Sequence, residues 1–346
     1  MHSVPMISIG GVRVPRLILG HLPFLGESYQ GPSKNAEYSR RFSGIRSIVT
    51  VLTKAVKQYG ITVMSAPTPL EGRSAIRLLK AIERISQSVN TCLALIICLR
   101  IPLLVDDRRI DDYRRWLTYY HIEKRYGETD ILWRYLSDPV LQARENWESR
   151  FIAKLKTSQP YSQELEKLEI DYDRVRKALA GLEDVRVLFI ELGSETDFLA
   201  MGKRLDILSD LVGWISDNFG YKCLLGCHHG GLTIPILERS KIDFYGYVTP
   251  ANKLGVMMFP TQKLSEAAIK STSKPVIAIK PFAGGRIPPK PALEYIYKDL
   301  NIPCCMIGVG SEEELERDAT VALQLLSGKP DEIDRYSRSY RRTRRY

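Results

Sequence analysis

The sequence predicts an α/β fold in which eight parallel strands, each followed by a helix, close into a (β/α)8 TIM barrel. Short apolar segments alternate with amphipathic segments along the 346 residues, and there are eight such strand–helix units. Each apolar segment is hydrophobic throughout, as strands buried on both faces of a parallel sheet are. An open, doubly wound sheet is the alternative for the same alternation.

The candidate strands are short runs rich in Val, Ile, Leu, Cys or Tyr. They are predicted at Arg16–Gly20, Ile61–Ala66, Cys92–Leu99, Val185–Leu192, Lys222–Cys227, Phe244–Val248, Val276–Lys280 and Cys304–Val309. Apolar residues at helical spacing predict the connecting helices. These helices are expected at Ile45–Tyr59, Arg73–Ile85, Leu205–Phe219, Gly231–Ser240, Gln262–Lys270, Pro291–Leu300 and Glu312–Leu326.

One interval, residues 101–184, is too long to be a single connection between the third and fourth strands. It reads as a helical insertion that carries three of the four tryptophans. Its helices are predicted at Ile110–Tyr126, Ile131–Leu136, Val140–Lys156 and Tyr172–Leu182. An insertion at this end of a strand lies over the catalytic mouth of a barrel. It therefore forms either a lid or a decoration that stabilises the barrel or a subunit contact. The long loop Leu22–Ser43 is expected at the same end.

The composition excludes several classes of protein. Hydrophobic residues make up 44% and charged residues 26% of the chain, which is too apolar for a disordered protein. No long uncharged apolar run predicts a membrane-spanning helix, and Met1–Gly20 lacks the pattern of a signal peptide. We therefore expect a cytoplasmic protein with no membrane partner and with six free cysteine thiols. Scarce Asn and Gln beside abundant Arg are similar to the composition of heat-stable proteins.

The net charge of +10 raises the question of a nucleic-acid partner. A single barrel domain is expected over residues 1–330, followed by a basic tail, 331–346, with six Arg, three acidic residues and interleaved Tyr. Such a tail can bind phosphates and stack on bases. The alternatives are a solvated tail, or one that binds an acidic patch of this chain or of a second copy in a homo-oligomer. The remaining charge is interleaved with acids and defines no basic face.

Polar residues at the carboxyl ends of barrel strands form the active site in this fold. Five of them are the predicted catalytic residues: His21, Glu191, His228, His229 and Lys280. Further polar side chains at the strand ends are Ser65, Cys98, Arg100, Ser194, Glu195, Cys227, Thr249 and Asn252. Three of the five histidines of the chain fall at such ends. The group is expected to contact a small-molecule ligand.

Three interpretations of these five residues remain open. His21, Glu191 and His228 can form a divalent metal site, because imidazole and carboxylate are common ligands. The same groups can transfer protons without a metal, or they can hold loops at the barrel end. Adjacent histidines point to opposite sides of an extended segment, so His228 and His229 need a turn to share one ion. Lys280 is predicted as a Schiff-base nucleophile, an acid–base group, an anion contact or an ion-pair partner of Glu191.

Two glycine-rich segments follow the last two strands and predict a phosphate site. The predicted binding residues are Gly284, Gly285, Arg286, Gly310 and Ser311. Backbone N–H groups at a helix start after strands seven and eight often bind phosphate in barrels. Ser311 and Glu314 form a capping box, but the acidic residues of this turn would repel an anion. The cofactor expectations are therefore a divalent metal or a phosphate-bearing nucleotide.

The two ends of the sequence resemble aldo/keto reductases. The resemblance covers the segment RLILG with Pro23–Phe24, the entry Tyr59–Ile61 into the second strand, PVIAIKPFAGG at 275–285 and IGVGSEEELERD at 307–318. It implies a (β/α)8 barrel and a pocket for the phosphate of a nucleotide cofactor.

The catalytic tetrad of that family is Asp, Tyr, Lys and His, and this sequence departs from it. The Asp position falls on Ser65 or Met64, and the Tyr position falls near Leu70. The Lys position falls at Cys98 or Arg100, and the His position at Glu191. The resemblance therefore implies the fold but not the hydride-transfer mechanism.

Three functions remain as hypotheses. The first is an enzyme of unassigned reaction that acts on a small, phosphorylated or unphosphorylated molecule. The second is a catalytically degenerate barrel that binds RNA or a ribosomal surface through tail 331–346. The third is a nicotinamide- or flavin-dependent oxidoreductase with catalytic residues that differ from those of the family.

Overall fold

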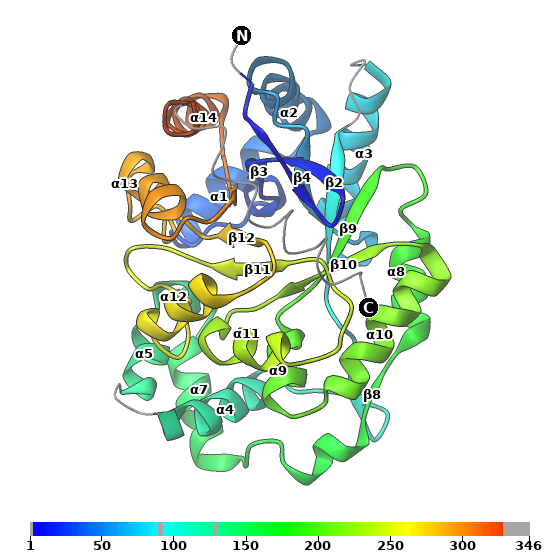
Figure 1. Cartoon of the computed structure of the whole chain (residues 1–346), viewed down its shortest axis with the longest axis vertical. Helices are drawn as coiled ribbons and strands as arrows, with labels where there is room; N and C mark the ends of the chain where they lie inside the picture. The colour runs from blue at the N-terminus through cyan, green and yellow to red at the C-terminus, as the bar shows by residue number, and fades with distance from the viewer. Residues whose placement is uncertain (1–2, 89–92, 127–129, 328–346) are drawn as a thin grey trace.

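The computed structural model describes residues 3–88, 93–126 and 130–327. Within these residues, eight parallel strands close into a barrel in the order β10-β11-β12-β13-β3-β4-β5-β9 (Figure 1). The strands are β3 (Leu17–Leu19), β4 (Val63–Pro67), β5 (Ala94–Leu99), β9 (Val187–Leu192), β10 (Lys222–Gly226), β11 (Tyr247–Pro250), β12 (Val276–Ile279) and β13 (Cys304–Ile307). The predicted barrel is confirmed.

The inside of the barrel is filled by alternate residues of these strands. Val63, Ile96, Phe189 and Leu224 belong to one buried apolar cluster. An antiparallel hairpin, β1 (Met6–Ile9) and β2 (Val12–Pro15), contributes Ile7, Ile9 and Val14 to this cluster. The hairpin was not predicted, and it covers the apolar layer inside the barrel. Since side chains alternate along a strand, the residues two positions further on also face inward at the other end.

Helices surround the barrel and alternate with its strands. They are α2 (Ile45–Tyr59), α3 (Arg73–Ser88), α8 (Tyr172–Ala180), α10 (Leu205–Phe219), α11 (Gly230–Glu238), α12 (Gln262–Ser271), α13 (Pro289–Glu294) and α14 (Glu312–Leu326). Helix α2 shows why these segments are helical. Its apolar residues recur on one buried face, and Gly60 ends it in a left-handed conformation with φ of 67°.

Several predicted boundaries differ from the observed ones, and three elements show the largest differences. Strand β11 lies at Tyr247–Pro250 rather than Phe244–Val248, because its ladder to β12 pairs Tyr247 with Val276. The helix predicted over Pro291–Leu300 is α13 followed by a π-helical turn, Tyr295–Asp299. The helix predicted over Val140–Lys156 is split into α6 (Pro139–Gln142) and α7 (Trp147–Thr157). Asn146, with φ of 53°, interrupts it.

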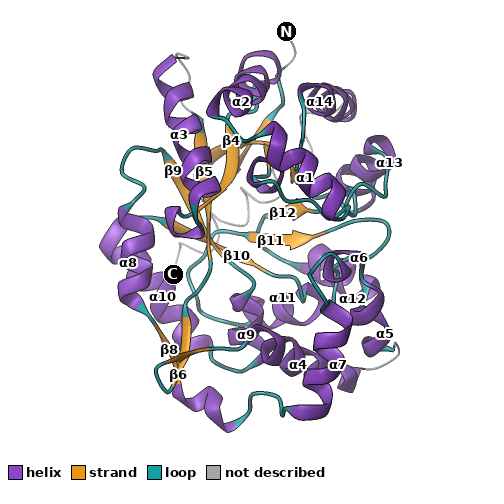
Figure 2. Ribbon diagram, turned by 180° about the vertical axis from the view of Figure 1, so that it is seen from behind, coloured by secondary structure: helices purple, strands orange, loops and turns teal. Residues whose placement is uncertain are grey.

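The insertion is not wholly helical, contrary to the expectation. It contains α4 (Asp112–Glu123), α5 (Ile131–Ser137), α6 and α7. It also contains a three-stranded antiparallel sheet of β6 (Leu103–Val105), β7 (Arg108–Arg109) and β8 (Leu168–Ile170). Its helices gather beside α9 (Glu195–Met201) and α11 (Figure 2). The loop Leu22–Ser43 holds a further helix, α1 (Pro32–Arg41).

Buried polar contacts fix the insertion to the loops that follow β9, β10 and β11. Glu123 of α4 bonds to His229, and Arg115 of the same helix bonds to Glu195. The Asp138 carboxylate accepts a hydrogen bond from the backbone N–H of Met257. The insertion therefore lies at the end of the barrel where the strands terminate. Whether it moves as a lid stays a prediction.

Several sequence-based expectations concern other parts of the chain. The tail 331–346 and Cys92 lie outside the described residues. Cys98, Cys223, Cys227, Cys304 and Cys305 are free thiols. In the part of the chain that the structure describes, no helix is both long and apolar enough to cross a membrane.

Candidate active site at the barrel mouth

Ser65, Cys98 and Glu191 form a polar layer inside the barrel, at its mouth. Each follows by two positions a residue of the buried apolar cluster: Val63, Ile96 and Phe189. Because side chains alternate along a strand, the three polar residues face the same interior. His21 lies two residues after the end of β3, and Lys280 directly follows β12. His228 follows β10, so six strand ends bring chemistry-bearing groups to one place.

Glu191 and Cys98 form the deepest pair. They are direct partners in the parallel ladder of β9 and β5, and the Cys98 Sγ–H donates to Glu191 Oε2 at 2.7 Å. Burial raises the pKa of the Glu191 carboxyl above its usual value, although the Cys98 hydrogen bond and the Lys280 charge act in the opposite direction. Burial, together with the neighbouring Glu191, also raises the pKa of the Cys98 thiol. Glu191 therefore keeps a proton to higher pH, and Cys98 stays a thiol.

Gly226 on the neighbouring strand β10 makes room for this carboxyl group. A Cβ atom at Gly226 would lie 3.0 Å from Glu191 Oε1 and 2.8 Å from the Leu192 carbonyl oxygen. Real Cβ atoms essentially never approach backbone so closely. The glycine therefore serves the placement of the Glu191 side chain.

Lys280 and His228 form the second pair. The Lys280 Nζ lies 3.2 Å from His228 Nε2, and 5.2 Å from the ring centroid of Tyr29. Burial, and then the charge of Lys280, lower the pKa of His228 well below its usual value. The ring is therefore neutral at pH 7. Because an ammonium group can only donate, Nε2 is the acceptor and Nδ1 carries the ring proton. Nδ1 is buried and has no hydrogen-bond partner among the described residues.

His21 and Ser65 form the third pair, with 2.7 Å between His21 Nδ1 and Ser65 Oγ. Burial lowers the pKa of His21 to about 4, and the charges of Lys280 and Arg100 act in the same direction. His21 is therefore also neutral at pH 7. The site combines two neutral imidazoles, a carboxyl group with a raised pKa and a lysine.

His229 points away from this group. Its Nδ1 lies 2.6 Å from Glu123 Oε1 of the insertion, and the side chain is 1% exposed. The Tyr119 ring centroid is 4.1 Å from that of His229. Adjacent histidines thus point in different directions, as the sequence suggested. The structure gives His229 a role in holding the insertion rather than a place beside Lys280.

Asp197 is a residue that the sequence analysis missed. It follows β9 in α9, is fully buried, and accepts hydrogen bonds from the backbone N–H groups of His228 and His229. Thr233 Oγ1 donates to the same carboxylate at 2.7 Å. Asp197 therefore fixes the loop that carries both histidines. Its position, two residues after the predicted strand-end Glu195, gave no distinguishing signal.

The residues of the predicted phosphate site already have protein partners. Arg286 donates to the carbonyl oxygens of Tyr29 and Ala283. Gly284 and Gly285 have positive φ and pack against Tyr29 and Gln30. These contacts place the loop that carries Tyr29 against the loop that carries Lys280.

At the start of α14, protein groups likewise occupy the backbone N–H donor and the space that a phosphate would need. The Gly310 N–H donates to Glu314 Oε2 at 2.7 Å, and Ser311 Oγ accepts from the Glu314 N–H. A Cβ at Gly310 would lie 2.1 Å from the Tyr38 ring. The Ser311 cap is confirmed, but Glu314 reaches back to the Gly310 N–H rather than to that of Ser311. This helix start does not fit a nucleotide phosphate, because a carboxylate occupies the anion position.

The metal set His21, Glu191 and His228 is not supported. Over residues 3–88, 93–126 and 130–327, no group of three or more His, Cys, Asp or Glu residues is arranged to hold a metal ion. Each of the three side chains instead has its own protein partner: Ser65, Cys98 and Lys280 respectively.

The other polar residues at the strand ends have contacts within the loops. The Arg100 side chain is 80% exposed and lies 3.5 Å from Glu71. The Asn252 side chain bonds to the backbone of Val256, and Glu195 pairs with Arg115. None of these contacts reaches the three pairs at the mouth.

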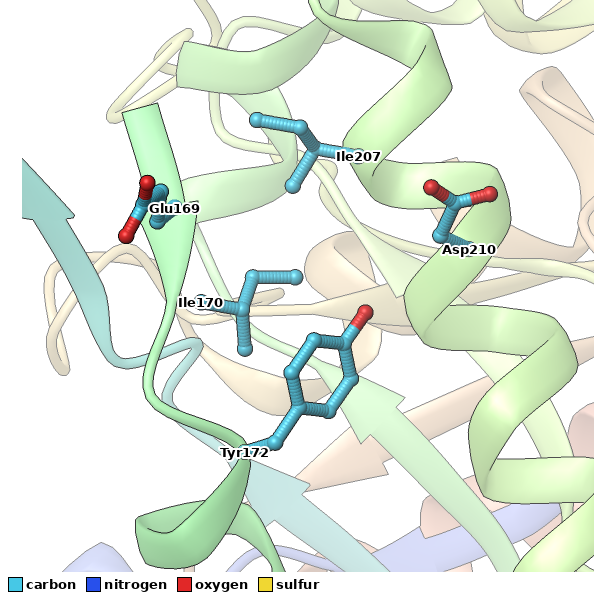
Figure 3. A pocket seen from close by; sticks show the side chains of 5 residues that line it. All are labelled: Glu169, Ile170, Tyr172, Ile207 and Asp210. Atoms are coloured by element: carbon cyan, nitrogen blue, oxygen red, sulfur yellow. The ribbon is translucent and has the colours of Figure 1, made fainter. Parts of the chain in front are cut away.

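A shallow hollow of about 340 Å³ lies elsewhere, between β8 and α10 (Figure 3). It is lined by Glu169, Ile170, Tyr172, Ile207 and Asp210. It contains none of the predicted site residues, so it offers control positions for experiments on the barrel mouth.

The barrel is similar to solved aldo-keto reductases. The structure titled "Putative aldo-keto reductase" from Pseudomonas aeruginosa is 14% identical, with a TM-score of 0.50, over 94% of this chain and 97% of that one. The fold is an aldo-keto reductase-like barrel. Identity this low shows the shared fold alone. No protein-family profile and no curated protein matches the sequence.

Two further structures have lower scores. A glycerol dehydrogenase from Gluconobacter oxydans is 11% identical over 97% of this chain and 94% of its own, with a TM-score of 0.46. An aldo-keto reductase of the silkworm Bombyx mori is 11% identical over 98% of this chain and 87% of its own, with a TM-score of 0.48.

Proposed function

We propose that this chain is an enzyme that binds a small molecule at the barrel mouth and transfers protons to and from it. The observation that carries the proposal is the convergence of the Cys98–Glu191 and Lys280–His228 pairs at one barrel end. Polar groups that meet at the carboxyl ends of barrel strands are the usual place of catalysis in this fold.

Glu191 is the proposed proton donor and His228 the proposed proton acceptor. An acid and a base must be in opposite protonation states at the same pH. Burial raises the pKa of the Glu191 carboxyl, so it holds its proton to higher pH than an exposed carboxyl group, and burial lowers the pKa of the His228 ring, which is therefore neutral. The same physical cause therefore prepares both groups for complementary roles.

Proton transfer can be measured without knowing the natural substrate. Ligands from a panel of small carboxylates, aldehydes and ketones are first selected by their effect on thermal unfolding. Those that bind are incubated with the enzyme in D2O, and loss of each C–H signal is followed by NMR. We expect Glu191→Gln to slow deuterium incorporation by roughly 10²–10⁴, the usual contribution of a positioned acid or base.

The matched control is Glu169→Gln, which changes an exposed carboxylate in the hollow of Figure 3. This variant should exchange deuterium at the wild-type rate. Equal rates for the wild-type chain and Glu191→Gln would contradict the proposal, provided that both proteins unfold at similar temperatures.

A nicotinamide-dependent oxidoreductase is the second candidate, and the likeness to the Pseudomonas aeruginosa structure favours it. Against it, Glu314 and Tyr38 occupy the start of α14. A titration with NADPH, followed by thermal unfolding and nucleotide fluorescence, separates the two candidates. A saturable shift would favour the oxidoreductase, and no shift supports the proton-transfer enzyme.

A further inference from the structure

Lys280 has an unusual setting for a lysine at the edge of a protein core. Within the described residues, its amine contacts the neutral imidazole of His228 and the face of Tyr29, and no carboxylate there comes within ion-pair distance. The nearby carboxyl group of Glu191 is bonded to Cys98 instead. A lysine with a purely structural role would be expected to pair with an acid.

The backbone holds Lys280 in place at some cost in free energy. Its φ of 56° lies in the left-handed region, which non-glycine residues seldom adopt. Such conformations persist where the surroundings enforce them, and they are concentrated at functional sites. Here the surroundings are the turn that continues to Ala283, whose N–H donates to the Lys280 carbonyl oxygen. The turn directs the amine toward His228.

We propose that Lys280 is a nucleophile that forms an imine with the carbonyl carbon of an aldehyde or ketone substrate. This inference rests on the proposed function and names the substrate class for it. The alternative, an ammonium group that only attracts an anion, would leave the neutral His228 Nε2 beside it without a chemical role.

The reaction balances with groups already at the mouth. The Lys280 ammonium gives one proton to His228 Nε2, and the free amine then adds to the carbonyl carbon. Glu191 protonates the carbonyl oxygen, receives a proton from the nitrogen, and returns it to the hydroxyl group as the C–O bond breaks. Water leaves and a protonated imine remains. Transfer of the proton from His228 to Glu191 restores both groups, so one ammonium and one carbonyl give one iminium and one water.

The neighbouring residues suit these steps. The Lys280 charge acts on Glu191, Cys98 and His21, as well as on His228, so all four lie within its electrostatic reach. Tyr29 lies against the amine, and an iminium ion keeps the positive charge that an aromatic face favours. The described site therefore accommodates the charge of both the reactant and the product.

Reductive trapping tests the imine directly. The full-length chain is incubated with pyruvate, glyceraldehyde or dihydroxyacetone in the presence of sodium borohydride, which reduces an imine to a stable secondary amine. Intact mass and peptide mapping then locate the adduct. We expect one adduct per chain, on Lys280, with at least one of the three probes.

Three variants make the result specific. Lys280→Arg should abolish the adduct, while Lys290→Arg, at an exposed position after the same strand, should leave it unchanged. His228→Gln keeps Lys280 and should slow trapping by roughly 10²-fold, because the proton acceptor is lost. Thermal unfolding of each variant shows that it is folded. His228→Gln keeps the test decisive if Lys280→Arg does not fold.

The outcomes separate the inference from the proposed function. No Lys280 adduct with any probe, or adducts spread evenly over surface lysines, would overturn the imine. If deuterium exchange still depends on Glu191 in that case, the proton-transfer enzyme stands without it. An adduct on Lys280 without Glu191-dependent exchange would instead retain the imine and remove the proposed role of Glu191.

Discussion

The Cys98 thiol and the Glu191 carboxyl group face each other across two adjacent strands, 2.7 Å apart, inside the barrel mouth. Neither group has its ordinary acidity, because burial raises both pKa values. Both groups therefore keep their protons to higher pH than exposed groups of the same kind. This pair is the basis of the proposed chemistry.

The first prediction concerns the energy of this pair. A double-mutant cycle with Cys98→Ala and Glu191→Gln should give a coupling free energy of about 0.5–1.5 kcal/mol, the usual range for a buried hydrogen bond. Urea unfolding of the four proteins measures it. Strictly additive effects would mean that the two groups do not interact in solution.

The variant Glu191→Gln should also change how the stability of the fold depends on pH. The folded state holds the Glu191 proton to higher pH than the unfolded state, so its contribution to stability is present at low pH. It is lost as pH rises through the folded-state pKa. Gln cannot ionise, so Glu191→Gln should gain stability relative to the wild type as pH rises above 4.5, the ordinary value for this carboxyl group. A constant difference would show that Glu191 titrates normally.

For His21 we predict the opposite dependence of stability on pH. Its folded-state pKa is about 4 and its ordinary value is 6.5, so the unfolded chain binds more protons between these values. Stability should therefore fall as pH is lowered through this window, by roughly 1–3 kcal/mol from this group. Urea unfolding of the wild type and His21→Gln from pH 7 to 4 measures the difference. Parallel curves for the two proteins would contradict the assignment.

Substitution of Glu123 tests how strongly the insertion is held against the barrel. Glu123→Ala removes the partner of His229 in a fully buried setting. Leaving one partner of a buried hydrogen bond unsatisfied costs about 1–3 kcal/mol. Limited proteolysis should then cleave the insertion faster than in the wild type. Glu148→Ala, at an exposed position of α7, is the control. Equal cleavage rates for the two variants would show that this contact does not hold the insertion.

Gly226 tests the space around Glu191. Gly226→Ala places a Cβ 2.8 Å from the Leu192 carbonyl oxygen and should destabilise the fold by about 1–3 kcal/mol, as overpacking does. Gly213→Ala in α10 has open space around the new Cβ and should instead stabilise the chain by about 0.5–1 kcal/mol. Chemical denaturation compares the two. A neutral Gly226→Ala would mean that β9 and β10 adjust freely.

The barrel was predictable because its signal is local and repeated. Each strand is a short apolar run, and each helix, such as Ile45–Tyr59, carries its own period and its own glycine stop. The small sheet of the insertion was not predictable. Its strands are two or three residues long and join Leu103–Val105 to Leu168–Ile170 across some sixty residues of sequence.

The candidate site was predicted in part, and the reason lies in side-chain direction. Strand ends identify His21, Glu191, His228 and Lys280, because their position along the strand determines the barrel end. Direction depends on loop geometry, which the sequence does not display. His229 therefore looked equivalent to His228, although Asp197 and Glu123 turn it into the insertion. Cys98 was noted as a strand-end residue, but its partnership with Glu191 required the register of β5 and β9.

The most direct test of the account is the rate of deuterium incorporation into a bound ligand by the double variant Glu191→Gln/His228→Gln. If these two groups act as one acid–base unit, each single variant loses most of the activity, and the double variant is no slower than the slower single variant. An exchange rate in the double variant equal to that of the wild-type chain would contradict the claim that the barrel mouth is the active site.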